Sequence, residues 1–191
     1  MRFSEKVAIV TGGAGGVGRA LVRTLTRDGA AAMVADVSAE GCRAVEEEIR
    51  AAGGAIGSVV GDLRDKAYCE RVVTETVERF GGVDILFNNA GIIPRGTILE
   101  TSDDMWHAAL DVNLTAMFYL SRAAIPAMKQ RGGGAIVNTS SVWGVYPGPG
   151  HLAYRTSKGA VASFTRSLGR DHAPDGIRVN AVCPHEINTA S

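Results

Sequence analysis

Residues 7–18 read VAIVTGGAGGVG, an uninterrupted apolar run that passes directly into a cluster of glycines. A continuous apolar run of this length predicts a strand that is buried on both faces. Behind the glycines, Val17, Leu21 and Leu25 recur at the spacing of one helix face. The stretch therefore predicts a strand, a tight turn and a helix, which is the repeating unit of a parallel α/β sheet.

The same alternation continues along the chain. Short β-rich runs predict strands and longer periodic runs predict helices, with further strands at about 33–35, 56–60, 83–87, 135–138 and 177–182, and helices at about 17–25, 42–49, 69–80, 102–130 and 152–172. Right-handed crossovers between them predict a doubly wound parallel sheet with helices on both faces, a three-layer α/β/α fold. Because no repeat or linker interrupts the pattern, we expect residues 1–191 to form one domain.

The composition limits the classes of partner. The 20 Lys and Arg residues balance the 20 Asp and Glu residues, so the formal net charge is zero. We expect no nucleic-acid partner, because proteins that bind nucleic acids normally carry a basic excess. No apolar run is long enough to cross a bilayer, so we expect no membrane association and a cytoplasmic location.

The cysteines and histidines show no ligand spacing. The 3 cysteines lie far apart and form neither a disulfide framework nor a CxxC pair. The 4 histidines show no HExxH pattern or paired spacing. We therefore expect no metal site.

The glycine cluster is a candidate phosphate site. Gly12, Gly16 and Gly18, with Val17, stand between the first strand and the first helix. Glycines let the backbone approach a pyrophosphate, which the positive N-terminus of a helix attracts. A glycine-rich turn without a ligand is the alternative.

Asp36 ends the second predicted strand. A carboxylate there can accept hydrogen bonds from both ribose hydroxyls of an adenosine and would repel a 2′-phosphate. Neither Gly15 nor Val37 offers a cation for such a phosphate. The sequence therefore favours NAD over NADP, with a role for Asp36 in capping the next helix as the alternative.

Tyr154 and Lys158 share one face near the start of a predicted helix. A free tyrosine has a pKa of about 10, and a neighbouring ammonium favours its phenolate. The pair is therefore a candidate general acid–base unit, although a Tyr-x-x-x-Lys pair alone is usually helix surface.

The surroundings of this pair match a known pattern. The chain resembles the classical subgroup of the short-chain dehydrogenase/reductase family, a Rossmann-type fold, in TGGAGGVG at 11–18, Asp62-Leu63, NNAG at 88–91, Asn113, Ser141, YRTSK at 154–158, Arg178-Val179-Asn180 and Pro184. These residues span almost the whole chain in the expected order.

The resemblance implies four catalytic roles. Tyr154 would exchange the substrate proton, and Lys158 would lower its pKa and hold the nicotinamide ribose. Ser141 would hydrogen-bond the substrate oxygen, and Asn113 would support a water that links Lys158 to solvent. Two alternatives stay open: Asn113 as a satisfied helix residue, and Ser141 as the cap of a loop.

The resemblance also implies cofactor contacts. Asp62 and Leu63 would meet the adenine, with a helix cap as the alternative for Asp62. The cofactor would also be lined by Asn89, Ala90 and Gly91. Its nicotinamide carboxamide would contact Ile187 and Thr189.

Two features depart from the family pattern. Pro184 is followed by His185, where the family usually has glycine. The chain also stops at Ser191, before the substrate-covering segment and last strand that the resemblance implies. We expect either a longer protein or a truncated member.

These features favour NAD-dependent hydride transfer between the nicotinamide and a small secondary alcohol or ketone. A 3-oxoacyl-acyl-carrier-protein reductase is the first alternative, and Asp36 counts against it because such reductases prefer NADP. A catalytically silent NAD-binding or scaffold protein is the alternative from another class.

The helix at 112–130 is apolar on several sides. The resemblance implies that this helix and the Tyr154 helix pair with a second subunit, giving a homodimer or homotetramer. Complete burial within one chain is the alternative.

Overall fold

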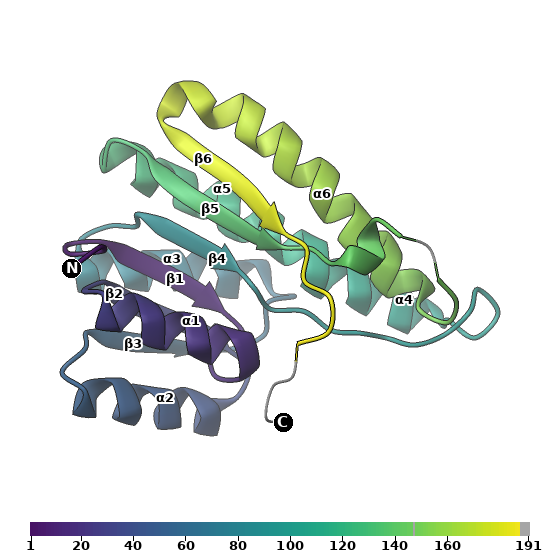
Figure 1. Ribbon diagram of the computed structural model, residues 1–191, viewed down its shortest axis with the longest axis horizontal. Helices are drawn as coiled ribbons and strands as arrows, with labels where there is room; N and C mark the ends of the chain where they lie inside the picture. The colour runs from purple at the N-terminus through teal and green to yellow at the C-terminus, as the bar shows by residue number, and fades with distance from the viewer. Residues whose placement is uncertain (147, 188–191) are drawn as a thin grey trace.

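A computed structural model describes residues 1–146 and 148–187 of the chain. Six parallel strands form one sheet in the order β3-β2-β1-β4-β5-β6 (Figure 1), with bounds β1 Val7–Thr11, β2 Ala31–Asp36, β3 Ile56–Val60, β4 Ile85–Asn88, β5 Gly134–Thr139 and β6 Ile177–Val182. The prediction of a doubly wound parallel sheet is confirmed.

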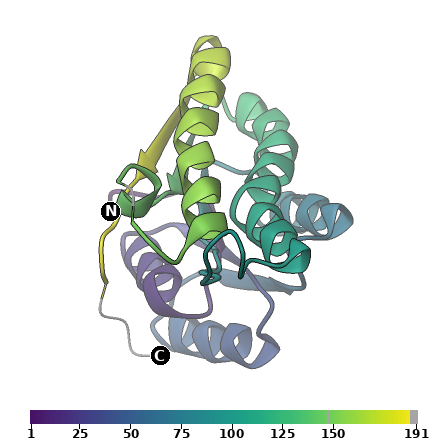
Figure 2. The ribbon, with the colours of Figure 1, turned by 90° about the vertical axis from the view of Figure 1, so that its right-hand side faces the viewer.

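The helices form two layers around the sheet (Figure 2), with bounds α1 Gly16–Arg27, α2 Ala39–Ala51, α3 Lys66–Phe80, α4 Asp103–Leu110, α5 Ala116–Gln130 and α6 Leu152–His172. Alternate residues of β1 face opposite layers, as expected of a strand with both faces buried. Ala8 and Val10 pack with α1 and α2, whereas Ile9 packs in the core formed with α3 and α5. This division gives the three-layer architecture.

The predicted helix at 102–130 differs from the observed one. Ser102 caps α4, since its Oγ accepts a hydrogen bond from Met105 N at 3.2 Å. A π-helical turn, Asp111–Thr115, then separates α4 from α5. The side chain of Asn113, inside this turn, bonds to the backbone of Ile92, so a contact from another segment accompanies the change of winding.

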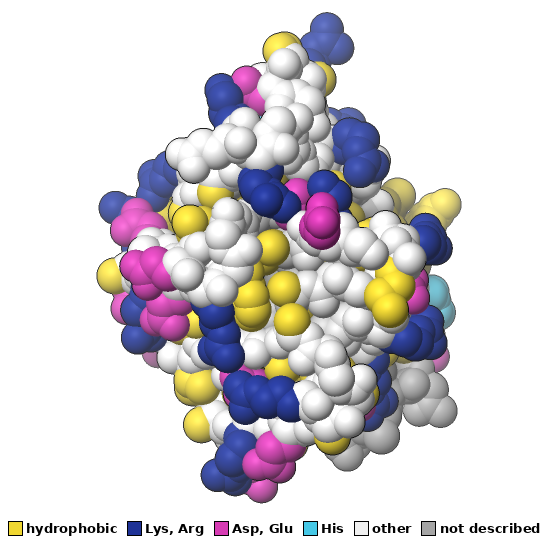
Figure 3. All heavy atoms as spheres, turned by 90° about the vertical axis from the view of Figure 1, so that its left-hand side faces the viewer, with side chains coloured by type: hydrophobic (Ala, Val, Ile, Leu, Met, Phe, Trp, Pro, Cys, Tyr) yellow, Lys and Arg dark blue, Asp and Glu magenta, His cyan; other side chains and the backbone are white. Residues whose placement is uncertain are grey.

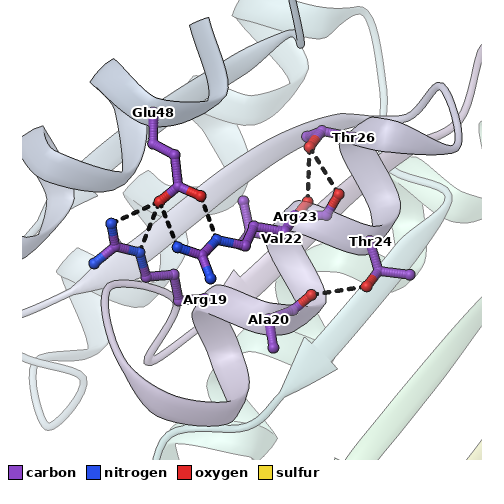
Figure 4. Close-up of polar contacts among 7 residues, drawn as sticks. All are labelled: Arg19, Ala20, Val22, Arg23, Thr24, Thr26 and Glu48. Atoms are coloured by element: carbon purple, nitrogen blue, oxygen red, sulfur yellow. Dashed lines mark hydrogen bonds and ion pairs between the residues drawn. The ribbon is translucent and has the colours of Figure 1, made fainter. Parts of the chain in front are cut away.

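Glu48 joins α1 and α2 (Figure 4). Its carboxylate accepts hydrogen bonds from both Arg19 and Arg23, and these bonds lower the pKa of Glu48 to about 2. The contact fixes α1, and hence the glycine turn that precedes it, against the helix that follows Asp36.

The amino ends of the strands face the viewer in Figure 3, where basic and acidic side chains are interspersed and the basic ones cover more of the surface. None of the helices in the described ranges combines the length and apolar character that crossing a membrane requires.

Candidate active site

The glycine turn brings the backbone close to the end of β4. Gly12 has φ +62°, and a Cβ there would lie 3.1 Å from Ala90 Cα. A Cβ on Gly18 would lie 2.0 Å from Gly12 O, so only glycine fits against the turn. Gly15 caps α1 without a side-chain hydrogen bond, which leaves the amide end at Gly16 and Val17 available to an anion.

Asp36 is held between the glycine turn and the loop after β2. Its Oδ2 accepts a hydrogen bond from Ala14 N at 3.1 Å, and its Oδ1 accepts one from Ser38 N at 3.0 Å. The side-chain cap of α2 is Ser38, whose Oγ accepts from Gly41 N at 3.0 Å. The helix-cap alternative for Asp36 is therefore wrong, because Ser38 takes that role.

A cleft of about 500 Å³ runs along the carboxyl ends of the strands. It brings together six of the predicted cofactor residues: Gly12, Asp36, Asp62, Leu63, Ala90 and Gly91. The cleft is also lined by Arg64, Ala108 and Val112, which the sequence interpretation did not single out. Ala108 and Val112 carried no signal in the sequence, because only the packing of α4 and the π-helical turn brings them to the cleft.

Asn89 has a supporting position beside this cleft. Its Nδ2 donates to Thr11 O at 3.1 Å, and its backbone N donates to Thr11 Oγ1 at 2.9 Å. These bonds tie the ends of β1 and β4 together. Asp62 does not cap α3 with its side chain, since Asp65 Oδ1 accepts from Ala67 N at 2.8 Å and takes that role.

Tyr154 and Lys158 lie in the first two turns of α6, and both are buried. Lys158 Nζ is 5.9 Å from the centre of the Tyr154 ring and donates to Thr139 O at 2.7 Å. Burial lowers the pKa of Lys158 to about 8. The ammonium is thus placed beside the phenol ring by a bond to the end of β5.

The two serines after β5 make different contacts. Ser140 Oγ donates to Lys158 O at 2.8 Å, which joins β5 to α6. Ser141 Oγ accepts from Trp143 N at 3.1 Å, so it does cap the short turn Val142–Gly144. The hydroxyl hydrogen of Ser141 is not used in that bond and can be donated to another group.

The side chain of Asn113 is fully buried and makes three hydrogen bonds. Its Oδ1 accepts from Ile92 N at 2.8 Å, and its Nδ2 donates to Ile92 O and to Ser157 Oγ, both at 3.0 Å. The side-chain amide of Asn113 is therefore fully hydrogen-bonded within the protein, as the alternative interpretation of this residue expects. A Cβ on Gly91 would lie 3.1 Å from Asn113 Oδ1 and 3.2 Å from Lys158 Nζ, so these atoms flank the same point of the backbone.

The segment after β6 is described only in part. Ile187 is half exposed and His185 is exposed, whereas Thr189 lies outside the described residues. Across residues 1–146 and 148–187, no three His, Cys, Asp or Glu side chains are grouped as metal ligands.

Comparison with known proteins agrees with this geometry. Residues 6–191 match the family model described as short chain dehydrogenase. A Thermotoga maritima protein named "Uncharacterized oxidoreductase" is 42% identical over 184 residues, which are 96% of this chain and 72% of that protein.

Two further relatives and a solved structure have more specific names. The 2,5-dichloro-2,5-cyclohexadiene-1,4-diol dehydrogenase LinX of Sphingobium indicum is 37% identical over 98% of this chain and 75% of its own length. The 3-oxoacyl-[acyl-carrier-protein] reductase FabG of Thermotoga maritima is 34% identical over 99% of this chain and 77% of its own. A crystal structure of a short-chain dehydrogenase/reductase from Burkholderia xenovorans superposes with a TM-score of 0.92 at 34% identity, covering 98% of this chain and 77% of that one.

Proposed function

This chain belongs to the short-chain dehydrogenase family, and on that premise we propose that it uses NAD, with Tyr154 as the acid–base residue. It is an oxidoreductase that acts on CH–OH groups, and its relatives include named dehydrogenases of this kind. We further propose that the substrate is a small secondary alcohol or ketone, and that residues 1–191 form one dinucleotide-binding domain.

The cleft has the features that a dinucleotide needs. The open amide end of α1 suits the pyrophosphate, and the fixed Asp36 carboxylate suits the ribose hydroxyls. A bound nicotinamide would supply the group that exchanges hydride with the substrate carbon. Its ribose and carboxamide would be held by Tyr154, Lys158, Ile187 and Thr189.

In this proposal, two side chains act on the substrate oxygen and a third, Lys158, acts on one of them. Tyr154 Oη exchanges the proton of the hydroxyl, because the nearby Lys158 ammonium stabilises its phenolate. Ser141 donates its hydroxyl hydrogen to the same oxygen.

Asn113 has a supporting role in the same proposal. It holds the π-helical turn beside Lys158 and supports a water that connects Nζ to solvent. Asn113 Oδ1 and Lys158 Nζ both lie beside Gly91, so the turn that Asn113 holds is next to the ammonium.

Asp36 carries the proposed preference for NAD over NADP. Its carboxylate is fixed at the end of β2 by two backbone amides, where a 2′-phosphate would meet a negative charge. Titration of the wild-type protein with both cofactors tests the preference, and tighter binding of NADP would contradict it.

The observation that carries the proposed mechanism is the buried Tyr154–Lys158 pair at the end of the cofactor cleft. Tyr154→Phe should abolish turnover of a panel of secondary alcohols and ketones, followed by NADH absorbance, while NADH binding stays within about twofold. Tyr119→Phe removes a phenol hydroxyl from α5 and should leave both unchanged. Full activity of Tyr154→Phe would contradict the mechanism.

The same assays separate the alternatives. Turnover of a 3-oxoacyl thioester with NADPH, faster than of any ketone with NADH, would favour the acyl-carrier-protein reductase. NAD binding without turnover of any substrate in the panel would favour the catalytically silent protein.

A further inference from the structure

Arg64 lines the cofactor cleft and forms hydrogen bonds with the carboxylate of Asp62. Its backbone N donates to Asp62 Oδ1 at 2.9 Å, while its Nε and Nη2 donate to Asp62 Oδ2 at 2.8 and 2.5 Å. A backbone bond from Asp65 N to Asp62 O at 3.0 Å closes the turn that carries both residues. The carboxylate is thus fixed by a neighbour two positions along the chain.

The strand order places this pair at one end of the proposed NAD site. The sheet runs β3-β2-β1, so the glycine turn after β1, Asp36 at the end of β2 and Asp62 after β3 follow one another along the cleft. A dinucleotide with its pyrophosphate at the glycine turn and its ribose at Asp36 would bring its purine to Asp62. Leu63, Ala108 and Val112 add apolar side chains to the lining of the same cleft.

The hydrogen bonds from Arg64 occupy most of the positions at which the Asp62 carboxylate could accept from a ligand. An ionised carboxylate accepts at about four lone-pair positions and donates at none. Arg64 fills three of these positions, so one acceptor position is left for a ligand. Hydrogen bonds from Arg64 also keep the pKa of Asp62 below its ordinary value, so the group stays an acceptor.

We propose that Arg64 is a positioning residue that fixes Asp62 as an acceptor, so that the site takes a 6-amino purine and disfavours a 6-oxo purine. The inference rests on the proposed function, because it assumes that NAD occupies the cleft. An adenine amino group can donate to the free acceptor position, whereas the carbonyl of hypoxanthine would place a second acceptor against it.

The test compares dissociation constants for NAD and for nicotinamide hypoxanthine dinucleotide. Arg64→Gln should weaken NAD binding about 3- to 10-fold, the effect of one hydrogen bond to a group in solvent contact. It should weaken the hypoxanthine analogue less, because a released Asp62 can turn away from the carbonyl, so the selectivity for NAD falls. Arg50→Gln is the matched control, because the Arg50 side chain is about as exposed as that of Arg64 and also pairs with a carboxylate, but does not line the cleft.

A second variant separates positioning from direct contact. If Arg64 acts through Asp62, Arg64→Gln should have no further effect in an Asp62→Asn background. An undiminished effect in that background, or a selective loss of NADP rather than NAD, would overturn the proposal. So would equal selectivity in Arg64→Gln and Arg50→Gln. Failure of the wild-type protein to bind NAD would instead contradict the proposed function.

Discussion

Asn113 Nδ2 donates a 3.0 Å hydrogen bond to Ser157 Oγ across a separation of 44 residues, and both side chains are fully buried. Ser157 Oγ in turn donates to Tyr154 O at 2.7 Å. The π-helical turn is thereby connected to the first two turns of α6, which carry the proposed acid–base pair. The position of that pair depends on a contact between two distant segments.

Replacing the hydroxyl in this connection should affect catalysis more than cofactor binding. Ser157→Ala leaves the buried Asn113 Nδ2 without one acceptor, and we expect a loss of about 1–3 kcal/mol in the free energy of unfolding. We also expect kcat to fall about tenfold, while the dissociation constant for NADH changes little. Ser121→Ala, a buried helical serine on α5, should change stability without lowering kcat. Equal kcat in the two variants would contradict the positioning of α6 by Ser157.

Lys158 gives a stability that depends on pH. Burial lowers its pKa from an ordinary 10.5 to about 8, so between these values the unfolded chain binds more protons than the folded chain. Wild-type stability should therefore rise with pH across this window, by about 2 kcal/mol between pH 7 and 9.5 relative to Lys158→Met. Denaturant unfolding of both proteins at the two pH values measures the difference. If the difference in unfolding free energy between wild type and Lys158→Met is the same at both pH values, the folded protein does not lower the pKa of Lys158.

Asp36 should determine the choice of cofactor. Asp36→Asn keeps an acceptor oxygen for Ala14 N or Ser38 N and removes the charge that would repel a 2′-phosphate. We expect the preference for NAD over NADP to fall by about tenfold, equivalent to about 1.4 kcal/mol. Glu40→Gln removes a charge from the first turn of α2 and should leave the ratio unchanged. Binding titrations with both cofactors measure it, and an unaltered ratio in Asp36→Asn would exclude this role.

Asp84 should contribute stability that is lost in acid. Burial opposes its ionisation, yet Val7 N, Arg131 and Lys6 donate to its carboxylate and hold its pKa below the ordinary value. Asp84→Asn should therefore cost about 1–3 kcal/mol at pH 7. The difference should begin to shrink below about pH 4 and should be lost as the pH falls through the lower pKa of the folded protein. Urea unfolding at pH 7, 3.5 and about 2.5 checks this, with the exposed Asp171→Asn as control. A cost that is independent of pH would assign the loss to packing.

Much of the fold could be predicted from the sequence because the decisive signals are local. The uninterrupted apolar run at Val7–Val10 predicts a buried strand, and the spacing of Val17, Leu21 and Leu25 predicts the helix behind it. The π-helical turn carried no such signal, since it accompanies hydrogen bonds between Asn113 and a distant segment at Ile92. The position of Arg64 could not be predicted either, because the direction of a surface arginine depends on the turn that carries it.

The faces of α5 and α6 lead to a prediction about assembly. A groove of about 240 Å³ lies between these helices, and Phe118 is 44% exposed on its wall, with the Arg122 guanidinium 4.6 Å from its ring centre. The family resemblance implies a homodimer or homotetramer, so we expect the wild-type protein to sediment as an oligomer.

Phe118→Arg should shift that protein towards the monomer, because it places a second cation beside Arg122 in a contact that symmetry would repeat. Val60→Arg, a change at a similarly exposed apolar residue on β3, is the matched control and should leave the oligomer intact. Sedimentation velocity at several concentrations measures the three proteins. A monomeric wild type at every concentration would contradict the assembly, and equal dissociation of both variants would place the contact elsewhere.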